Sequence, residues 1–195
     1  MESVVAPVFR EWPKIPRLRR DCVITEKIDG TNGCIHIAEE GAPIIMGSGR
    51  EIPFLVGSRT RWIFPENDNF GFASWAFANA EELLKLGPGT HYGEWWGPGI
   101  QRRYGIAQKR FSLFNRGRWN EENLPTPLVS VVPVVAEGLF SDALVEEALA
   151  RLFVGGSLAS PGFMLPEGVV VYHTASGHLY KVLLKGDAIP KGEKK

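Results

Sequence analysis

Short strand-like segments, closely spaced and separated by turn residues, place the tightest limit on how this chain can fold. Eight segments are rich in β-branched or aromatic residues and are bounded by glycine, proline or polar residues, as strands are. They predict antiparallel sheets, with a hairpin turn at Glu39-Glu40-Gly41 between the second segment and the third. The segments are residues 21–25, 33–40, 42–47, 54–63, 110–114, 128–135, 167–173 and 178–184.

Two longer segments have helical periodicity. Residues 72–87 end at Gly87-Pro88, a pair that stops a helix. Residues 141–156 begin with Ser141 as the N-cap and end at two glycines. Helices that are few and do not alternate with strands indicate the α+β class. The expected apolar faces are Trp75, Ala76, Leu83 and Leu84 in the first helix, and Leu144, Val145, Ala148, Leu149 and Leu152 in the second.

Composition excludes several classes of function. A length of 195 residues predicts a single domain over residues 1–195. The sequence has no apolar run of the ~20 residues that a membrane span needs, and its first residues lead us to expect no secretory leader. Two cysteines make no disulfide framework, which favours the reducing cytoplasm, and four scattered histidines predict no zinc site. Because the net charge is zero, any contact with nucleic acid must come from local basic patches.

Lys27 stands at the end of an apolar run and directly before a tight turn, in the tetrapeptide Lys27-Ile28-Asp29-Gly30. A lysine at such a bend is usually a solvated charge. A nucleophilic amine needs the same geometry, since it must be held by a strand, presented over a turn and placed near groups that accept its proton. The tetrapeptide alone does not distinguish a solvated lysine from a nucleophilic one, because four common residues recur by chance.

Three further stretches follow Lys27 in a fixed order. Glu94 lies between a tyrosine-glycine pair and two tryptophans, Glu167 heads an apolar strand, and Lys181 lies in the next strand. Taken in order with Lys27, they resemble motifs III, IV and V after motif I of the covalent nucleotidyltransferases. This superfamily contains the polynucleotide ligases and the mRNA capping enzymes.

The resemblance is closest to the RNA ligase 2 family and extends over residues 22–185. Motif I of that family reads E-K-x-x-G-T-N, which residues 26–32 match, and its motif III reads G-E-x-x-G-x-G-I-Q, which residues 93–101 match. Five motifs in the right order are far more specific than any one of them.

Two shorter matches leave alternatives open. Residues 57–62, GSRTRW, resemble motif Ia, with Arg59 as the phosphate-facing arginine and Arg61 as the alternative. Residues 109–115, KRFSLFN, resemble the aromatic motif, with Phe114 as the residue that stacks on the base and Phe111 as the alternative.

The resemblance implies both a fold and a reaction. The fold is an α+β, antiparallel-sheet nucleotidyltransferase, an ATP-grasp-like ligase core with a few helices and no OB-fold. In the reaction, the Lys27 amine attacks the α-phosphate of ATP, forms lysyl-N–AMP and releases pyrophosphate. An ordinary lysine is protonated at neutral pH, so the amine must be desolvated or lie near other cations. Lys181, Arg59 and a bound Mg²⁺ or Mn²⁺ would provide these cations.

The remaining site residues also take their roles from the resemblance. Glu94 would hold the ribose hydroxyls, and Glu167 would be the carboxylate linked to the metal. The adenine would lie between Phe114 and Val170. The other nucleotide-binding positions are Glu26, Ile28 and Asn32, with backbone beside the lysine reading the adenine edge. Adjacent strand residues face opposite ways, so the Glu26 side chain is not expected beside the Lys27 amine.

The sequence departs from the family pattern in three respects. Motif V usually has lysines two residues apart, whereas Leu183 holds that position here and only Lys185 could substitute. Ten residues follow Lys185, so we expect no C-terminal domain, and a flexible tail over 186–195. Asp29 is shared with DNA ligases and capping enzymes, and therefore motif I does not separate RNA from DNA.

The sequence thus predicts a cytoplasmic, ATP-dependent RNA ligase-like adenylyltransferase that acts on nucleic-acid ends or nicks, RNA rather than DNA. One alternative is a core that adenylylates itself but needs a partner protein for sealing. Another is a non-catalytic module that binds a nucleotide or an RNA end. The basic groups at 17–20, 102–103 and 109–110 either contact phosphodiester backbone or are solvated surface.

Overall fold

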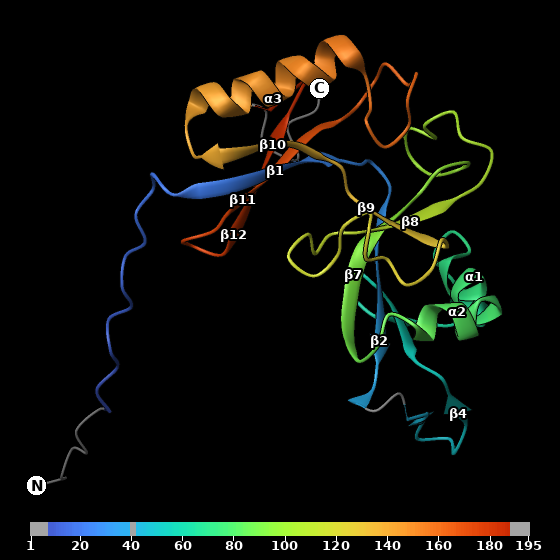
Figure 1. The fold of residues 1–195 in the computed structure, drawn as a ribbon. Coiled ribbons are helices and arrows are strands. Elements are labelled where there is room, and N and C mark those ends of the chain that lie inside the picture. Colours follow the sequence, from blue (N-terminus) through green and yellow to red (C-terminus); the bar gives the residue numbers. More distant parts are fainter. Residues whose placement is uncertain (1–7, 40–41, 188–195) are drawn as a thin grey trace, which may run out of the picture.

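The computed structural model describes residues 8–39 and 42–187, which form two main sheets (Figure 1). The first sheet has four strands in the order β10-β1-β11-β12, and all of its pairs are antiparallel. The second sheet has six strands in the order β6-β5-β2-β7-β8-β9. A small third sheet pairs β3 (Ile44–Ile45) with β4 (Glu51–Ile52).

One face of the first sheet is covered by α3 (Asp142–Gly155), the orange helix in Figure 1. Inward side chains alternate along β1, where Cys22 and Ile24 pack with Ala148 and Leu152 of the helix. Because alternate residues face opposite ways, Lys27 lies on the other face. The strands of this sheet are β1 (Asp21–Lys27), β10 (Val134–Leu139), β11 (Gly168–His173) and β12 (His178–Leu183).

The second sheet packs against two short helices, α1 (Phe72–Ala78) and α2 (Ala80–Leu84), which contribute to the largest apolar core. Its pairs are antiparallel except for β8 and β9, which run parallel. Mixed sheets with few helices confirm the predicted α+β class. The strands are β2 (Thr31–Ile37), β5 (Leu55–Ser58), β6 (Trp62–Ile63), β7 (Gly89–Trp96), β8 (Arg110–Leu113) and β9 (Val129–Val131).

The single helix predicted over residues 72–87 is wrong, because the chain breaks it at Asn79. The Asn79 side chain donates a hydrogen bond to the carbonyl of Trp75 (2.8 Å), and its φ and ψ of −117° and 29° are not helical. A short 3₁₀ helix, η2 (Pro65–Asn67), precedes these two helices.

Two of the predicted strands are divided, and two strands, β4 and β7, were missed. Residues 54–63 form β5 and β6 with a turn between them. Residues 128–135 divide at Pro133, which has no N–H to donate, so β9 joins the second sheet and β10 joins the first. The segment of β7 was predicted as a motif but not as a strand. The hairpin turn predicted at Glu39-Glu40-Gly41 lies partly outside the described residues.

The N-terminus of α3 supports a stability prediction. The Ser141 hydroxyl accepts a hydrogen bond from the backbone N–H of Leu144 (3.2 Å), as the sequence led us to expect. Ser141→Ala is expected to lower the free energy of unfolding by about 1 kcal/mol, because that N–H loses its acceptor. Urea unfolding measures the change, and Ser141→Asp, which can still accept the bond, is the control. Equal losses in both variants would contradict the capping role.

Candidate active site

Lys27 and Glu167 form an ion pair where two strands of the first sheet meet. Lys27, the last residue of β1, pairs with Gly168, the first residue of β11. This register places the preceding residue, Glu167, beside the lysine, with 2.6 Å between Nζ and Oε2. Only 25% of the lysine side chain and 17% of the glutamate side chain are exposed. The ammonium is therefore held in a largely desolvated position with one carboxylate as its partner.

Glu94 links the turn after Lys27 to the second sheet. Its carboxylate accepts hydrogen bonds from the backbone N–H of Gly30 (2.9 Å) and from Nδ2 of Asn32 (3.0 Å). Asn32 on β2 is directly opposite Glu94 on β7. A side chain at position 30 would put its Cβ 2.4 Å from the carbonyl oxygen of Trp95 and 3.0 Å from Cγ of Glu94, so only glycine permits this close approach.

The environment of Glu94 makes its carboxyl harder to ionise. Burial, the largest cause, raises the pKa of Glu94 to about 7. The Gly30 N–H and the charge of Lys27 lower this pKa, whereas the charges of Glu167 and Asp29 raise it. The influence of these groups shows that Glu94 belongs to the same electrostatic cluster as Lys27 and Glu167.

Arg102 and Tyr104 hold the turn from the other side. Arg102 forms an ion pair with Asp29 (2.9 Å) and also donates to the carbonyl of Leu165 (3.1 Å), two residues before Glu167. The Tyr104 hydroxyl accepts from the backbone N–H of Asp29 (2.7 Å), and burial raises the pKa of Tyr104. Arg102 therefore connects the segment after Lys27 with the segment before Glu167.

The side chains on either side of Lys27 are engaged in the interior. The Glu26 carboxylate accepts hydrogen bonds from the Ser157 hydroxyl (2.6 Å) and from two backbone N–H groups, those of Leu158 (2.7 Å) and Ala159 (2.9 Å). Ile28 is packed in an apolar cluster with Trp96 and other residues. Contact of Glu26 or Ile28 with a nucleotide would therefore involve their backbone.

Val170 and Lys181 lie on the same face of the first sheet as Lys27. Val170 pairs with Thr25 on one side and with Lys181 on the other, and Thr25 shares its face with Lys27. Val170 is half-buried and Lys181 is exposed. Lys185 lies beyond the end of β12 and is also exposed.

The remaining predicted residues lie on or near the second sheet. Phe111 is completely buried against Phe72, whereas Phe114, just after β8, is 40% exposed. Of the two phenylalanines, only Phe114 has a ring that a base can reach. Arg59 and Arg61 lie in the exposed turn between β5 and β6. Arg61 donates to the carbonyl of Asn67 (3.1 Å), and no side-chain hydrogen bond of Arg59 occurs within residues 8–39 and 42–187.

The carboxylates near Lys27 are suited to a metal ion whose ligands are mainly phosphate oxygens. Among the described residues, no three His, Cys, Asp or Glu side chains gather into a metal-binding group. Mg²⁺ commonly takes one or two carboxylates and completes its shell with waters and substrate phosphates. Glu167, part-exposed beside Lys27, can supply one such carboxylate.

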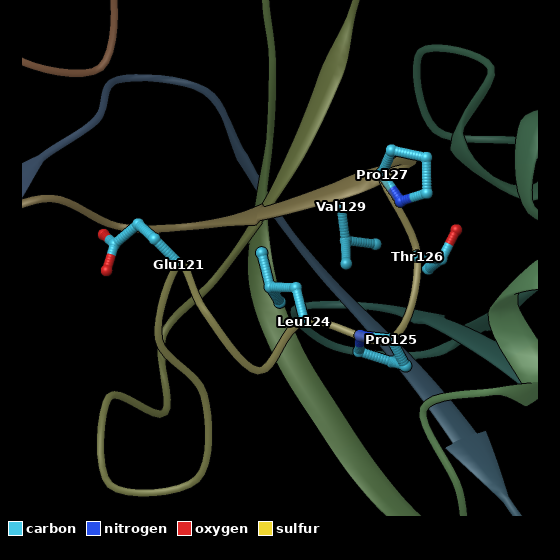
Figure 2. A pocket seen from close by; sticks show the side chains of 6 residues that line it. All are labelled: Glu121, Leu124, Pro125, Thr126, Pro127 and Val129. Atoms are coloured by element: carbon cyan, nitrogen blue, oxygen red, sulfur yellow. The ribbon is translucent and has the colours of Figure 1, made fainter.

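The hollow drawn in Figure 2 is not this site. It has a volume of about 350 Å³ and lies along the loop before β9. None of the predicted site residues lines it, and the Thr126 hydroxyl at its edge bonds to Glu82 (2.9 Å). Its lining residues are Glu121, Leu124, Pro125, Thr126, Pro127 and Val129.

Lys27 at the end of β1 thus pairs with Glu167, beside a turn that Glu94 links to the second sheet. Together with the family match, this α+β fold defines an RNA ligase-like nucleotidyltransferase. The RNA ligase family model matches residues 20–185, and the chain belongs to this family. In the described part of the chain, every helix is too short or too polar to cross a bilayer.

Solved structures of the Naegleria gruberi RNA ligase share the fold. A lysine-to-alanine variant with ATP and Mn superposes with a TM-score of 0.58 at 17% identity, and covers 86% of this chain and 50% of that one. The ligase with PPi gives a TM-score of 0.57 at 16% identity, covering 86% and 50%. A lysine-to-methionine variant with AMP and Mn gives 0.55 at 17%, covering 85% and 50%. The chain thus spans about half the length of these ligases. Comparison with curated proteins finds no match.

Proposed function

We propose that the chain is an ATP-dependent RNA ligase-like adenylyltransferase that forms a covalent lysyl-AMP at Lys27. The observation that carries this proposal is the pairing of Lys27 with Glu167 at 2.6 Å, in the electrostatic cluster that includes Glu94. Two findings support ATP as the substrate. The chain belongs to the RNA ligase family, and structurally similar ligases were solved with ATP or AMP. The unit responsible would be a single nucleotidyltransferase domain with an ATP-grasp-like core and no OB-fold.

In the first step, the Lys27 amine attacks the α-phosphorus of ATP. A P–N bond forms while the bond from that phosphorus to the bridging oxygen breaks, and pyrophosphate leaves with the electron pair. The attacking nitrogen must first lose a proton, and Oε2 of Glu167 is already hydrogen-bonded to it.

Other residues of the chain would hold the nucleotide for this attack. An ionised Glu94 accepts hydrogen bonds from the ribose hydroxyls, and Asn32 fixes its carboxylate. The exposed ring of Phe114 and the half-buried Val170 contact the two faces of the adenine. Arg59 and Lys181 are exposed cations that bind phosphate oxygens.

A divalent metal, Mg²⁺ or Mn²⁺, would be held by the phosphates and by Glu167. Such an ion supplies neutralisation of the negative charge on the phosphate oxygens. Structurally similar ligases were solved with Mn, which supports a divalent ion at this family's site.

The later steps are transfer of AMP to a 5′-phosphate and attack by a 3′-hydroxyl, which seals an RNA end or nick. A second candidate is an adenylylating core that needs a partner protein for sealing.

Incubation with ATP radiolabelled at the α-phosphate, Mg²⁺ and a nicked RNA duplex separates these candidates. We expect a labelled protein on a denaturing gel and, in the complete reaction, a sealed strand. Label without sealing would support the partner-dependent core. An unlabelled protein with either Mg²⁺ or Mn²⁺ would contradict the proposed chemistry and leave only a binding module.

Arg102 provides a test of how the two segments around the lysine are positioned. Arg102→Ala is expected to slow label formation by about tenfold to a hundredfold, since small displacements of reacting groups have effects of that size. The free energy of unfolding should change by less than about 1 kcal/mol, because the ion pair with Asp29 is partly exposed. Single-turnover kinetics and urea unfolding measure the two effects. The neighbouring Arg103→Ala is the control, and equal rates in both variants would exclude a positioning role.

A further inference from the structure

The segment of residues 8–20 combines large apolar side chains with positive charge. In Figure 1 it is the blue coil that extends away from the body and leads into β1. Its large apolar side chains are between 67% and 89% exposed, although side chains of this size are usually buried. They are Val8, Phe9, Trp12, Ile15 and Leu18.

The charge of the molecule is concentrated on the same segment. Residues 8–20 contain five cations and one acid, Glu11, which gives a net charge of +4 in a chain whose total is zero. None of the five cations forms an ion pair within the part of the chain that the structure describes. The cations are Arg10, Lys14, Arg17, Arg19 and Arg20.

The base of the segment is fixed to the first sheet. His173 donates through Nε2 to the carbonyl of Leu18 (2.6 Å), and the Phe140 N–H donates to the carbonyl of Arg20 (3.0 Å). Pro13 and Pro16 disfavour a helix farther out, and residues 8–17 form neither helix nor strand. The segment therefore starts from a defined point and presents interspersed apolar and basic side chains to solvent.

We propose that residues 8–20 bind the RNA strand whose end lies at Lys27. Extended basic chain neutralises phosphates, and exposed aromatic rings such as Phe9 and Trp12 stack on bases that a single strand leaves free. A protein groove that accepted only the apolar side chains would leave five cations without partners. This inference rests on the proposed function, because that function places a strand end at Lys27.

The geometry sets the length of strand required. The segment joins β1 at Asp21, and β1 extends over 7 residues to Lys27. At ~3.3 Å per residue these 7 residues span about 23 Å, which at ~3.4 Å per nucleotide of a helical strand corresponds to about seven nucleotides. A strand with this helical rise and fewer nucleotides does not reach the segment while its end lies at Lys27.

The test measures the affinity of fluorescein-labelled, 5′-phosphorylated RNAs of about four and about twelve nucleotides, lengths on either side of that limit. Trp12→Ala should weaken binding of the longer RNA by about 5- to 150-fold, the effect of losing one stacked base, and leave the shorter RNA unaffected. Trp12→Phe should retain most of the affinity. Trp62→Ala, at another exposed tryptophan, is the matched control.

The charge contribution is tested by salt dependence. Removing Lys14 and Arg17 together should reduce the slope of log affinity against log salt concentration by about 1.4, at ~0.7 per phosphate contact on a single strand. Removing Arg50 and Lys85, two cations of the body, should leave the slope unchanged. All variants should unfold at the wild-type temperature.

Wild-type affinity and slope in the variants of residues 12, 14 and 17 would overturn the inference. A second result would also overturn it. If the wild type is dimeric, Trp12→Ala is monomeric and both bind RNA equally well, the segment contacts a second copy of the chain. Failure of the proposed function would give a different result. The wild type would take no label from ATP, while the wild type and the variants would still differ in affinity for the longer RNA.

Discussion

Lys27→Ala is expected to abolish covalent labelling by ATP, with a loss of at least about a thousandfold, because no other side chain in the site can form the P–N bond. The reason is positional as well as chemical. Lys27 has its amine in a largely desolvated place beside Glu167, whereas Lys181 and Lys185 are exposed at and beyond β12. Lys27→Arg should be equally inactive, since a guanidinium keeps its proton and is not a nucleophile.

Labelling on a denaturing gel measures this loss, and Lys85→Ala is the matched control. Lys85 is a half-exposed lysine at the end of α2, where it is paired with Glu82. Its variant should label at the wild-type rate. Label that persists in Lys27→Ala would assign the nucleophile to another residue and contradict the proposed reaction.

Glu94→Gln is expected to change activity and stability in opposite directions. Burial raises the pKa of Glu94 from 4.5 to about 7, so the folded state holds a proton that the unfolded state has already lost. Between these two pH values the folded state binds more protons, and stability therefore falls as pH rises. The loss reaches about 3 kcal/mol above pH 7, at 1.36 kcal/mol per pKa unit. Glutamine has no charge to bury and avoids this cost.

The labelling rate of the wild type should change with pH in the opposite direction to its stability. The ribose hydroxyls need an ionised acceptor, so labelling by the wild type should increase as pH rises through about 7. Glu94→Gln should label about ten- to a hundredfold more slowly at pH 8, the effect of losing a charged hydrogen-bond acceptor, and without this pH dependence.

Urea unfolding at pH 5 and at pH 8, with labelling rates at the same values, checks both effects. Glu82→Gln is the control, because hydrogen bonds from Lys85 and Thr126 hold the pKa of Glu82 below its ordinary value. That carboxyl is ionised throughout the range, and its variant should leave the pH profile unchanged. A Glu94→Gln protein that is less stable than the wild type at pH 8 would contradict the account.

The sequence predicted the family and the strands that carry Lys27, Val170 and Lys181, since each motif lies on a segment with clear alternation. It also predicted α3 and its cap, because Ser141 precedes an apolar stripe with helical spacing. These features depend on local pattern, which a single sequence contains.

Features that depend on contacts distant in sequence could not be predicted. Arg102 was predicted either to contact phosphodiester backbone or to be solvated surface. Its ion pair with Asp29 was not predicted, since the two residues are 73 positions apart in the sequence. The sequence left Phe111 open as the alternative to Phe114 for the residue that stacks on the base, because residues 110–114 have the alternation of any half-buried strand. The packing of Phe111 against Phe72 distinguishes the two, since it leaves only the Phe114 ring exposed. The assignment of β9 and β10 to different sheets likewise depends on which strands each one pairs with.

One measurement tests the central claim most directly, namely the crystal structure of the protein incubated with ATP and a divalent metal. We expect continuous density from Nζ of Lys27 to the phosphorus of AMP, with Glu94 against the ribose and Val170 against the base. AMP or ATP bound without that bond, while Lys27 keeps its ion pair with Glu167, would contradict it.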